Sequence, residues 1–221
     1  GRNWAIDLTH CKGITDVSSL SKVKYLSLSY CENITNVSML GNVNSLFLSS
    51  CPKITDIKAL GKLEFLKMSE SEIYDVSPLK NIRELCLSKS KKISDVSMLG
   101  NVHILDLSEC QCITDVSMLG GVHTLKLKDC QCITDVSALG TVYDLDLERC
   151  LNICDVSKLG KVHILNLSGC HYISDVSALG DVYSLNLSFC TGIKNLSGLE
   201  RVTKLNVDYF KYRPKIEEII N

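Results

Sequence analysis

Cysteine is the residue with the greatest capacity for chemistry in this sequence, because twelve of the 221 residues are cysteines. Thiols can form disulfides, bind metal ions or act as nucleophiles. No C-x-x-C pair and no Cys/His zinc spacing occurs in the chain. Eight cysteines recur close to multiples of 20 residues: Cys11, Cys31, Cys51, Cys110, Cys130, Cys150, Cys170 and Cys190. A uniform column offers no defined disulfide pairing, so we predict buried packing thiols and a reducing compartment such as the cytoplasm, because oxidation would bridge thiols at random.

Aspartate recurs with the same period. Carboxylates stacked at strand spacing repel one another unless each is compensated, and a calcium ladder is one way to compensate them. Capping is the other, in which each Asp or Asn accepts hydrogen bonds from the backbone amides two and three residues on. We favour capping, because the glycines of calcium-binding repeats are absent and Asn replaces Asp twice. The column comprises Asp16, Asn36, Asp56, Asp75, Asp95, Asp115, Asp135, Asp155, Asp175 and Asn195.

A third column carries rings: His103, His123, Tyr143, His163 and Tyr183. Only the first two members are neighbouring histidines. Two imidazoles without a carboxylate or thiolate partner make a poor metal site. We interpret this column as a favoured surface residue copied with its repeat, and we predict neither a metal nor another cofactor.

An internal repeat positions all three columns. The template V-x-x-L-x-L-S-x-C-x-x-I-T-D-V-S-x-L-G-x describes ten copies with a period of 20, although the copy over residues 63–81 has 19 residues. Numbered along this template, cysteine holds position 9 and glycine holds position 19. Residues 1–207 are therefore predicted to form one array of about ten full repeats and a partial one, with no linker and no second domain.

Each copy predicts a short strand followed by tight turns. The leucines at positions 4 and 6, such as Leu105 and Leu107, point to one side of a strand, and positions 3, 5 and 7 point to the other. One copy cannot bury its apolar side chains alone, whereas stacked copies form a continuous core. Twenty residues leave little room for a full helix, so we expect a turn or 3-10 segment across D-V-S-x-L. The glycine at position 19 predicts a corner with positive φ.

The pattern resembles the leucine-rich repeat family, whose hallmark is L-x-x-L-x-L-x-x-N/C-x-L with a period of 20–29 residues. Pairs such as Leu105 and Leu107, or Leu165 and Leu167, carry the resemblance, with cysteine at the Asn-or-Cys position. These repeats are similar to arrays of large DNA viruses and protist surface proteins, and I-T-D-V-S-x-L is similar to internalin repeats. The resemblance implies an α/β solenoid that binds proteins, with a curved parallel sheet on its concave face and short turns or 3-10 segments on its convex face.

Positions 3, 5 and 7 carry whatever is individual to this chain, because the inward positions hardly vary. Aromatic residues on neighbouring copies are costly to leave in water and are enriched in interface hot spots. A charged, mainly acidic stretch further along the array suits the steering of a partner. The predicted partner-binding residues of the concave face are Tyr25, Phe47, Phe65, Lys67, Asp106, Lys126, Asp144, Asp146 and Glu148.

Four cysteines lie outside the column: Cys86, Cys112, Cys132 and Cys154. Cys112 and Cys132 occupy equivalent loop positions in adjacent copies, so they are the one plausible disulfide pair. Cys86 is expected to face the concave side as a free thiol, and no histidine falls near it in the repeat map. We therefore do not predict a catalytic cysteine.

The two ends of the array differ. Residues 208–221 break the repeat, and Pro214 can open a helix at its first turn, so we predict a helical C-terminal cap over these residues. Trp4 at the other end already stands within an expected strand, with no cap before it. An open end exposes apolar core and a strand edge, which predicts either a missing N-terminal part or self-association at this end.

Composition limits the function. A formal charge of −1 gives no electrostatic reason to expect nucleic acid, and no apolar stretch is long enough for membrane insertion. We find no nucleophile–base pair and no phosphate loop, so we predict no catalysis. The expected function is a protein-interaction scaffold. The alternatives are a structural or surface protein that self-associates and, by resemblance, the substrate-recognition arm of a ubiquitin-ligase adaptor.

Overall fold

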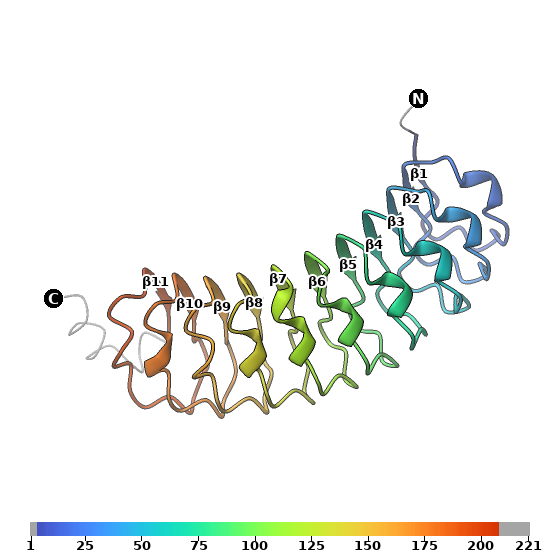
Figure 1. Ribbon diagram of the computed structural model, residues 1–221. Coiled ribbons are helices and arrows are strands. Elements are labelled where there is room, and N and C mark those ends of the chain that lie inside the picture. Colours follow the sequence, from blue (N-terminus) through green and yellow to red (C-terminus); the bar gives the residue numbers. More distant parts are fainter. Residues whose placement is uncertain (1–3, 208–221) are drawn as a thin grey trace.

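Each L-x-L segment forms a strand of three residues, and the strands stack in chain order into one parallel sheet of eleven strands. The computed structural model describes residues 4–207, in which the strands line the inner side of a curved solenoid (Figure 1). Neighbouring strands pair at equivalent positions, as Leu105 with Leu125, so each template position becomes a column. The strands are β1 (Ala5–Asp7), β2 (Tyr25–Ser27), β3 (Ser45–Phe47), β4 (Phe65–Lys67), β5 (Glu84–Cys86), β6 (Ile104–Asp106), β7 (Thr124–Lys126), β8 (Asp144–Asp146), β9 (Ile164–Asn166), β10 (Ser184–Asn186) and β11 (Lys204–Asn206).

Short 3-10 helices follow the capping motif, as the repeat length predicts. Turns replace the helix at residues 157–158 and 197–198. The leucine-rich architecture predicted for the array is therefore confirmed, whereas the predicted cap at 208–221 lies outside the described residues. The helices are η1 (Ser18–Leu20), η2 (Ser38–Leu40), η3 (Lys58–Leu60), η4 (Ser77–Leu79), η5 (Ser97–Leu99), η6 (Ser117–Gly121), η7 (Ser137–Leu139) and η8 (Ser177–Leu179).

The core is a bundle of seven inward columns, at template positions 1, 4, 6, 9, 12, 15 and 18. The outermost described repeats bury less of these columns, and Ile6 and Leu205 are only partly covered. In the interior repeats the inward side chains are almost fully buried, because the copies on both sides cover them. The copy that contains β6 shows the pattern, with exposed fractions of 0–2% for Val102, Leu105, Leu107, Cys110, Ile113, Val116 and Leu119.

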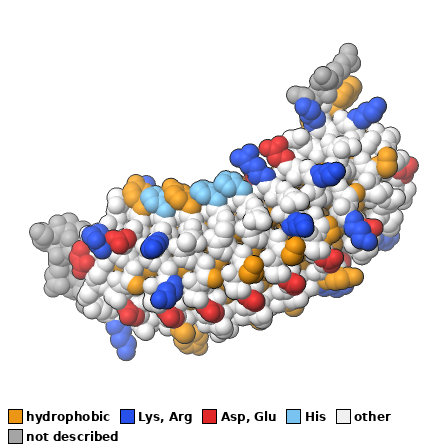
Figure 2. Space-filling model, viewed as in Figure 1, with side chains coloured by type: hydrophobic (Ala, Val, Ile, Leu, Met, Phe, Trp, Pro, Cys, Tyr) orange, Lys and Arg blue, Asp and Glu red, His pale blue; other side chains and the backbone are white. Residues whose placement is uncertain are grey.

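The Asp column caps the 3-10 turns. Asp115 Oδ1 accepts a hydrogen bond from the Ser117 amide at 2.8 Å, and Asn36 makes the same bond to Ser38 at 2.9 Å. The predicted bond to the amide two residues on is thus confirmed, but the Asp or Asn stands one residue before the N-cap, which is Val116 in η6 and Val37 in η2. The backbone and hydroxyl donors of Ser117 hold the pKa of Asp115 below its ordinary value. Figure 2 shows acidic side chains in a row along the lower part of the molecule.

The predicted positive φ at position 19 is wrong. Gly100 and Gly140 both have right-handed backbone conformations, with φ of −61° and −62°. Glycine is favoured at Gly140 because a Cβ there would collide with the carbonyl oxygen of Lys158 in the next coil. Positive φ occurs instead at position 8, three residues after the end of each strand from β1 to β10, for example at Lys89 and Glu109 (62° and 61°).

Candidate functional site

The open face of the sheet is built by positions 3 and 5 of each strand, because positions 4 and 6 point into the core. The registers set Phe47 beside Lys67, Lys67 beside Cys86, and Cys86 beside Asp106. The predicted face is therefore one continuous surface along the inner side of the solenoid (Figure 1). It falls into an aromatic part, a thiol and hydroxyl part, and a charged part.

The aromatic part, here called the aromatic cluster, comprises Tyr25, Phe47 and Phe65. The Phe47 ring lies 5.0 Å from that of Tyr25 and 4.9 Å from that of Phe65, measured between centroids, in tilted arrangements. Tyr25 is 42% exposed, while the two Phe rings are half-buried. The rings thus shield one another, and the cluster presents an ordered apolar surface with exposed Lys67 beside it.

The charged part lies on β6–β8, and several of its groups also hold the fold together. Asp146 Oδ1 accepts hydrogen bonds from the Glu148 amide at 3.0 Å and from Asn166 Nδ2 at 2.9 Å. Burial raises the pKa of Asp146 above its ordinary value, against the effect of these bonds. Glu148 pairs with Lys128 at 2.9 Å. We did not anticipate this pairing, which leaves Glu148 less available to a partner than its residue type suggested.

The remaining predicted charges differ in what they contact. Asp106 Oδ1 accepts from the Ser108 amide at 3.0 Å, whereas Asp144 is half-buried and Lys126 is exposed. Lys126 lies between the strands of Asp106 and Asp146. No ion pair to Lys126 is present within residues 4–207. Within the charged part, Asp144 and Lys126 are therefore the side chains with the most freedom to meet a partner.

Cys86 joins the two parts, and its expected position on the open face is confirmed. It is a free, half-buried thiol. Its Sγ lies 3.4 Å from Ser69 Oγ, 3.6 Å from Ser88 Oγ and 3.6 Å from Asp106 Oδ2. The two serine hydroxyls contact each other at 2.9 Å. This small polar row separates the aromatic cluster from the charged part.

The ring column at position 2 forms a continuous stack, which sequence reasoning missed. The ring centroids of His103, His123, Tyr143, His163 and Tyr183 follow one another at 4.7–4.8 Å, with interplanar angles of 5–22°. Lys204 Nζ lies 5.3 Å from the Tyr183 ring centroid. Figure 2 shows histidines and hydrophobic side chains in this row on the upper rim. The recurrence of rings at one template position was the signal available in the sequence.

The cysteine column points inward, as predicted. Cys130 Sγ donates to the Leu107 carbonyl at 3.2 Å, and Cys150 Sγ to the Leu127 carbonyl at 3.0 Å. Burial raises the pKa of Cys130 to about 12, which keeps the thiol protonated and unreactive. Cys112 and Cys132, the plausible disulfide pair, are both free and exposed in the structure. Cys154 is also an exposed free thiol.

Two features are absent from the described residues. Within residues 4–207, no three His, Cys, Asp or Glu side chains are grouped so that they could hold a metal ion. The same residues contain no helix with the length and apolar character needed to cross a bilayer. The feature suited to binding is therefore the open sheet face, with its aromatic cluster and its charged part.

Parallel three-residue strands, inward leucines and a 20-residue coil together define the leucine-rich repeat fold. Solved structures agree. Internalin C2 of Listeria monocytogenes superposes with a TM-score of 0.61 at 23% identity, covering 94% of this chain and 100% of that chain. An internalin F of the same species gives 0.53 at 21% identity, covering 94% and 80%. At these identities the likeness shows the fold alone. No protein-family model and no curated protein matches the sequence.

The inward thiols also have a counterpart. The functional domain of internalin J from Listeria monocytogenes, described as including a cysteine ladder, superposes with a TM-score of 0.53 at 20% identity, covering 92% of this chain and 53% of that chain. A cysteine ladder is thus compatible with this fold in a solved protein. In our chain the column is interrupted once, at Ser71 and Ser90, whose hydroxyls contact each other at 2.9 Å.

Proposed function

We propose that this protein is an interaction module whose concave sheet binds a protein ligand, without catalysis of its own. The observation that carries the proposal is the aromatic cluster. Tyr25, Phe47 and Phe65 project from an open, rigid sheet, and each ring is held by its neighbour at about 5 Å. Anchors that are already ordered lose little side-chain entropy on binding, which is the property of effective hot spots.

The charged part supports the proposal in a different way. Asp144 and Lys126 lie on neighbouring strands of the same face. Charges of this kind favour correctly oriented encounters and reject like-charged partners more than they add affinity. We therefore expect a partner that covers the cluster with apolar side chains and meets β7 and β8 with complementary charges.

Nucleic acid is the natural competitor, because a complex of the leucine-rich protein TLR13 with single-stranded RNA shares the fold at a TM-score of 0.54 and 17% identity, covering 89% of this chain and 39% of that chain. Our chain differs from what RNA binding requires, since its 24 basic and 25 acidic residues leave a charge of −1. RNA therefore serves as a control ligand in the test of the proposal.

The test is affinity capture from the native host, followed by measurement of the captured protein's binding to variants. Replacing Phe47 and Phe65 by Ala should weaken binding by about 30-fold or more, the size of a hot-spot loss of about 2 kcal/mol. Tyr172→Ala is the matched control, because this ring is 68% exposed and lies outside the sheet face. Thermal unfolding of each variant checks that the solenoid is intact.

Four results would argue against the proposal or favour an alternative. Unchanged affinity of the double variant would show that the aromatic cluster does not anchor the partner. Tighter binding of RNA than of any captured protein would move the function to nucleic acid. Light scattering that shows a concentration-dependent oligomer, with no captured protein, would favour the self-associating structural role, and capture of ubiquitin-ligase subunits would favour the adaptor role.

A further inference from the structure

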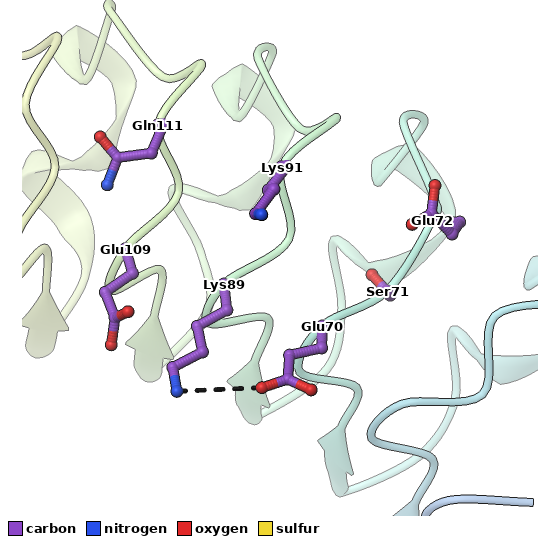
Figure 3. Close-up of a pocket in the computed structure, with 7 residues that line it drawn as sticks. All are labelled: Glu70, Ser71, Glu72, Lys89, Lys91, Glu109 and Gln111. Carbon is purple, nitrogen blue, oxygen red and sulfur yellow. Dashed lines mark ion pairs between the residues drawn. The ribbon is translucent and has the colours of Figure 1, made fainter.

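A hollow of about 480 Å³ opens where the repeat pattern is broken, beside the loops that follow β4, β5 and β6 (Figure 3). It lies past the ends of the strands, so it is separate from the aromatic cluster. Its walls are polar, and it holds charges of both signs. The lining residues are Glu70, Ser71, Glu72, Lys89, Lys91, Glu109 and Gln111.

A missing residue creates one wall of this hollow. In the 19-residue copy, Glu72 alone separates Ser71 from the inward Ile73. The full-length copies have two residues at this point, and these form a turn in the copies around it, as Gln111 and Cys112 do. The short copy has no turn there, and its loop is one residue shorter than those of its neighbours.

A missing side-chain bridge leaves the hollow open on the next repeat. Gln111 Nε2 donates to the Asp129 carbonyl at 2.7 Å, and Gln131 Nε2 donates to the Arg149 carbonyl at 2.7 Å. These bonds tie position 10 of one coil to position 8 of the next. Lys91 holds position 10 beside Glu109, and no equivalent bond from Lys91 is present in the part of the chain that the structure describes. Figure 3 shows Lys91 and Glu109 on the same hollow.

The charges of the hollow divide into paired and unpaired groups. Glu70 accepts from Ser50 Oγ at 2.6 Å and lies 3.8 Å from Lys89 Nζ, the pair marked in Figure 3. Glu72 pairs with Lys92, outside the lining, at 2.8 Å. Lys91 and Glu109 remain, and neither side chain has an ion pair or hydrogen bond within residues 4–207.

We propose that this hollow is a second binding site, for a short polar peptide segment that carries both a carboxylate and a basic group. Lys91 receives the carboxylate and Glu109 receives the ammonium or guanidinium. A segment with both charges satisfies both groups, whereas a singly charged ligand leaves one of them unpaired beside it. The site does not require the concave face to bind anything, so the two proposals stand separately.

The test uses defined peptides and amide chemical shifts of the full chain. The probes are acetylated and amidated Lys-Gly-Glu and Glu-Gly-Lys, with Gln-Gly-Gln as the uncharged control. At least one zwitterionic peptide should give saturable shifts at residues 89–91 and 109–111 in the millimolar range, at least tenfold more tightly than the control. Absence of saturable shifts, or equal shifts with Gln-Gly-Gln, would overturn the proposal.

Two variants sharpen the result. Lys91→Gln removes the charge and restores the residue that bridges the coils elsewhere, so it should close the hollow and abolish peptide binding. Glu109→Gln should weaken binding at least tenfold. Lys62→Gln is the matched control, since Lys62 is exposed and outside the hollow. Full binding by both hollow variants would refute the site. The comparison of charged and uncharged peptides uses only the unmodified protein, so it does not depend on whether the variants fold.

Discussion

The repeats of β2–β5 and those of β6–β10 bury the same inward columns but differ in what they present outward. The first group carries the aromatic cluster on its face and a polar rim, where Asn44 Nδ2 donates to Glu64 at 2.8 Å and Arg83 lies 3.6 Å from the same carboxylate. It also contains the short copy and the serine break in the cysteine column. The second group is regular and has the stacked rings on its rim. The contrast indicates that the inward columns hold the fold in both groups, while the aromatic cluster and the hollow lie where the copies diverge most.

The largest effect should come from an inward residue of the regular group. Leu105 is fully buried, so Leu105→Ala leaves a cavity and should cost about 2–5 kcal/mol in the free energy of unfolding. Its neighbour Ile104 points to the open face, and Ile104→Ala should cost less than about 1 kcal/mol because the site is partly exposed. Urea titration measures both. Equal losses would mean that outward residues also carry the fold.

The column at position 19 tests the comparison, because the copies of β6–β9 have glycine there and the short copy has Lys80. Gly140→Ala places a Cβ against the Lys158 carbonyl and should cost about 1–3 kcal/mol, the range of overpacking. Lys80 already carries a side chain in the same right-handed conformation, with φ of −58°. Lys80→Ala should therefore change the free energy of unfolding by less than about 0.5 kcal/mol. A loss below about 0.5 kcal/mol for Gly140→Ala would show that the next coil shifts to admit the Cβ.

The repeat made most of the fold predictable, because inward leucines, cysteines and capping Asp residues recur at fixed positions. Glycine was misassigned for a physical reason, since the approach of the Lys158 carbonyl depends on the next coil rather than on Gly140 itself. Position 8 gave no signal for its positive φ, because residues as different as Tyr30 and Phe189 occupy it. The hollow could not be predicted either. A one-residue deletion in the sequence does not reveal that Lys91 makes no hydrogen bond to the next coil in the described structure.

The two rims should differ in what a substitution costs. His123 stacks on His103 at 4.7 Å and on Tyr143 at 4.8 Å, so His123→Ala loses two ring contacts and should cost about 0.5–1.5 kcal/mol. His123→Phe keeps a ring in the column and should restore most of the loss. Glu64→Ala on the polar rim removes one exposed ion pair and one hydrogen bond and should cost less than about 0.5 kcal/mol. Thermal unfolding compares the three variants. If His123→Ala lowered the stability less than Glu64→Ala does, the ring stack would have no structural role.

Asp residues with lowered pKa values occur in both groups, Asp75 and Asp95 in the first and Asp115 in the second, so acid should destabilise both. Hydrogen bonds from the Ser117, Ser137 and Ser157 backbone amides and hydroxyls hold the pKa of Asp115, Asp135 and Asp155 below the ordinary value. Lowered folded-state pKa values mean that the carboxylates stabilise the fold above the unfolded-state pKa of about 4. This contribution is lost as the pH falls through the lower folded-state values, so the melting temperature should drop in acid.

Asparagine tests this cause, because Asn36 and Asn195 make the same bond with a neutral side chain, at 2.9 and 3.1 Å. Replacing Asp115, Asp135 and Asp155 by Asn should preserve the melting temperature at neutral pH and reduce its fall between about pH 5 and pH 2. The substitution also removes the repulsion by which neighbouring carboxylates raise the pKa of Asp135. An undiminished fall in acid would assign the pH dependence to other groups. The half-buried Asp146 on β8 is not one of them, because its raised pKa makes it respond in the opposite sense.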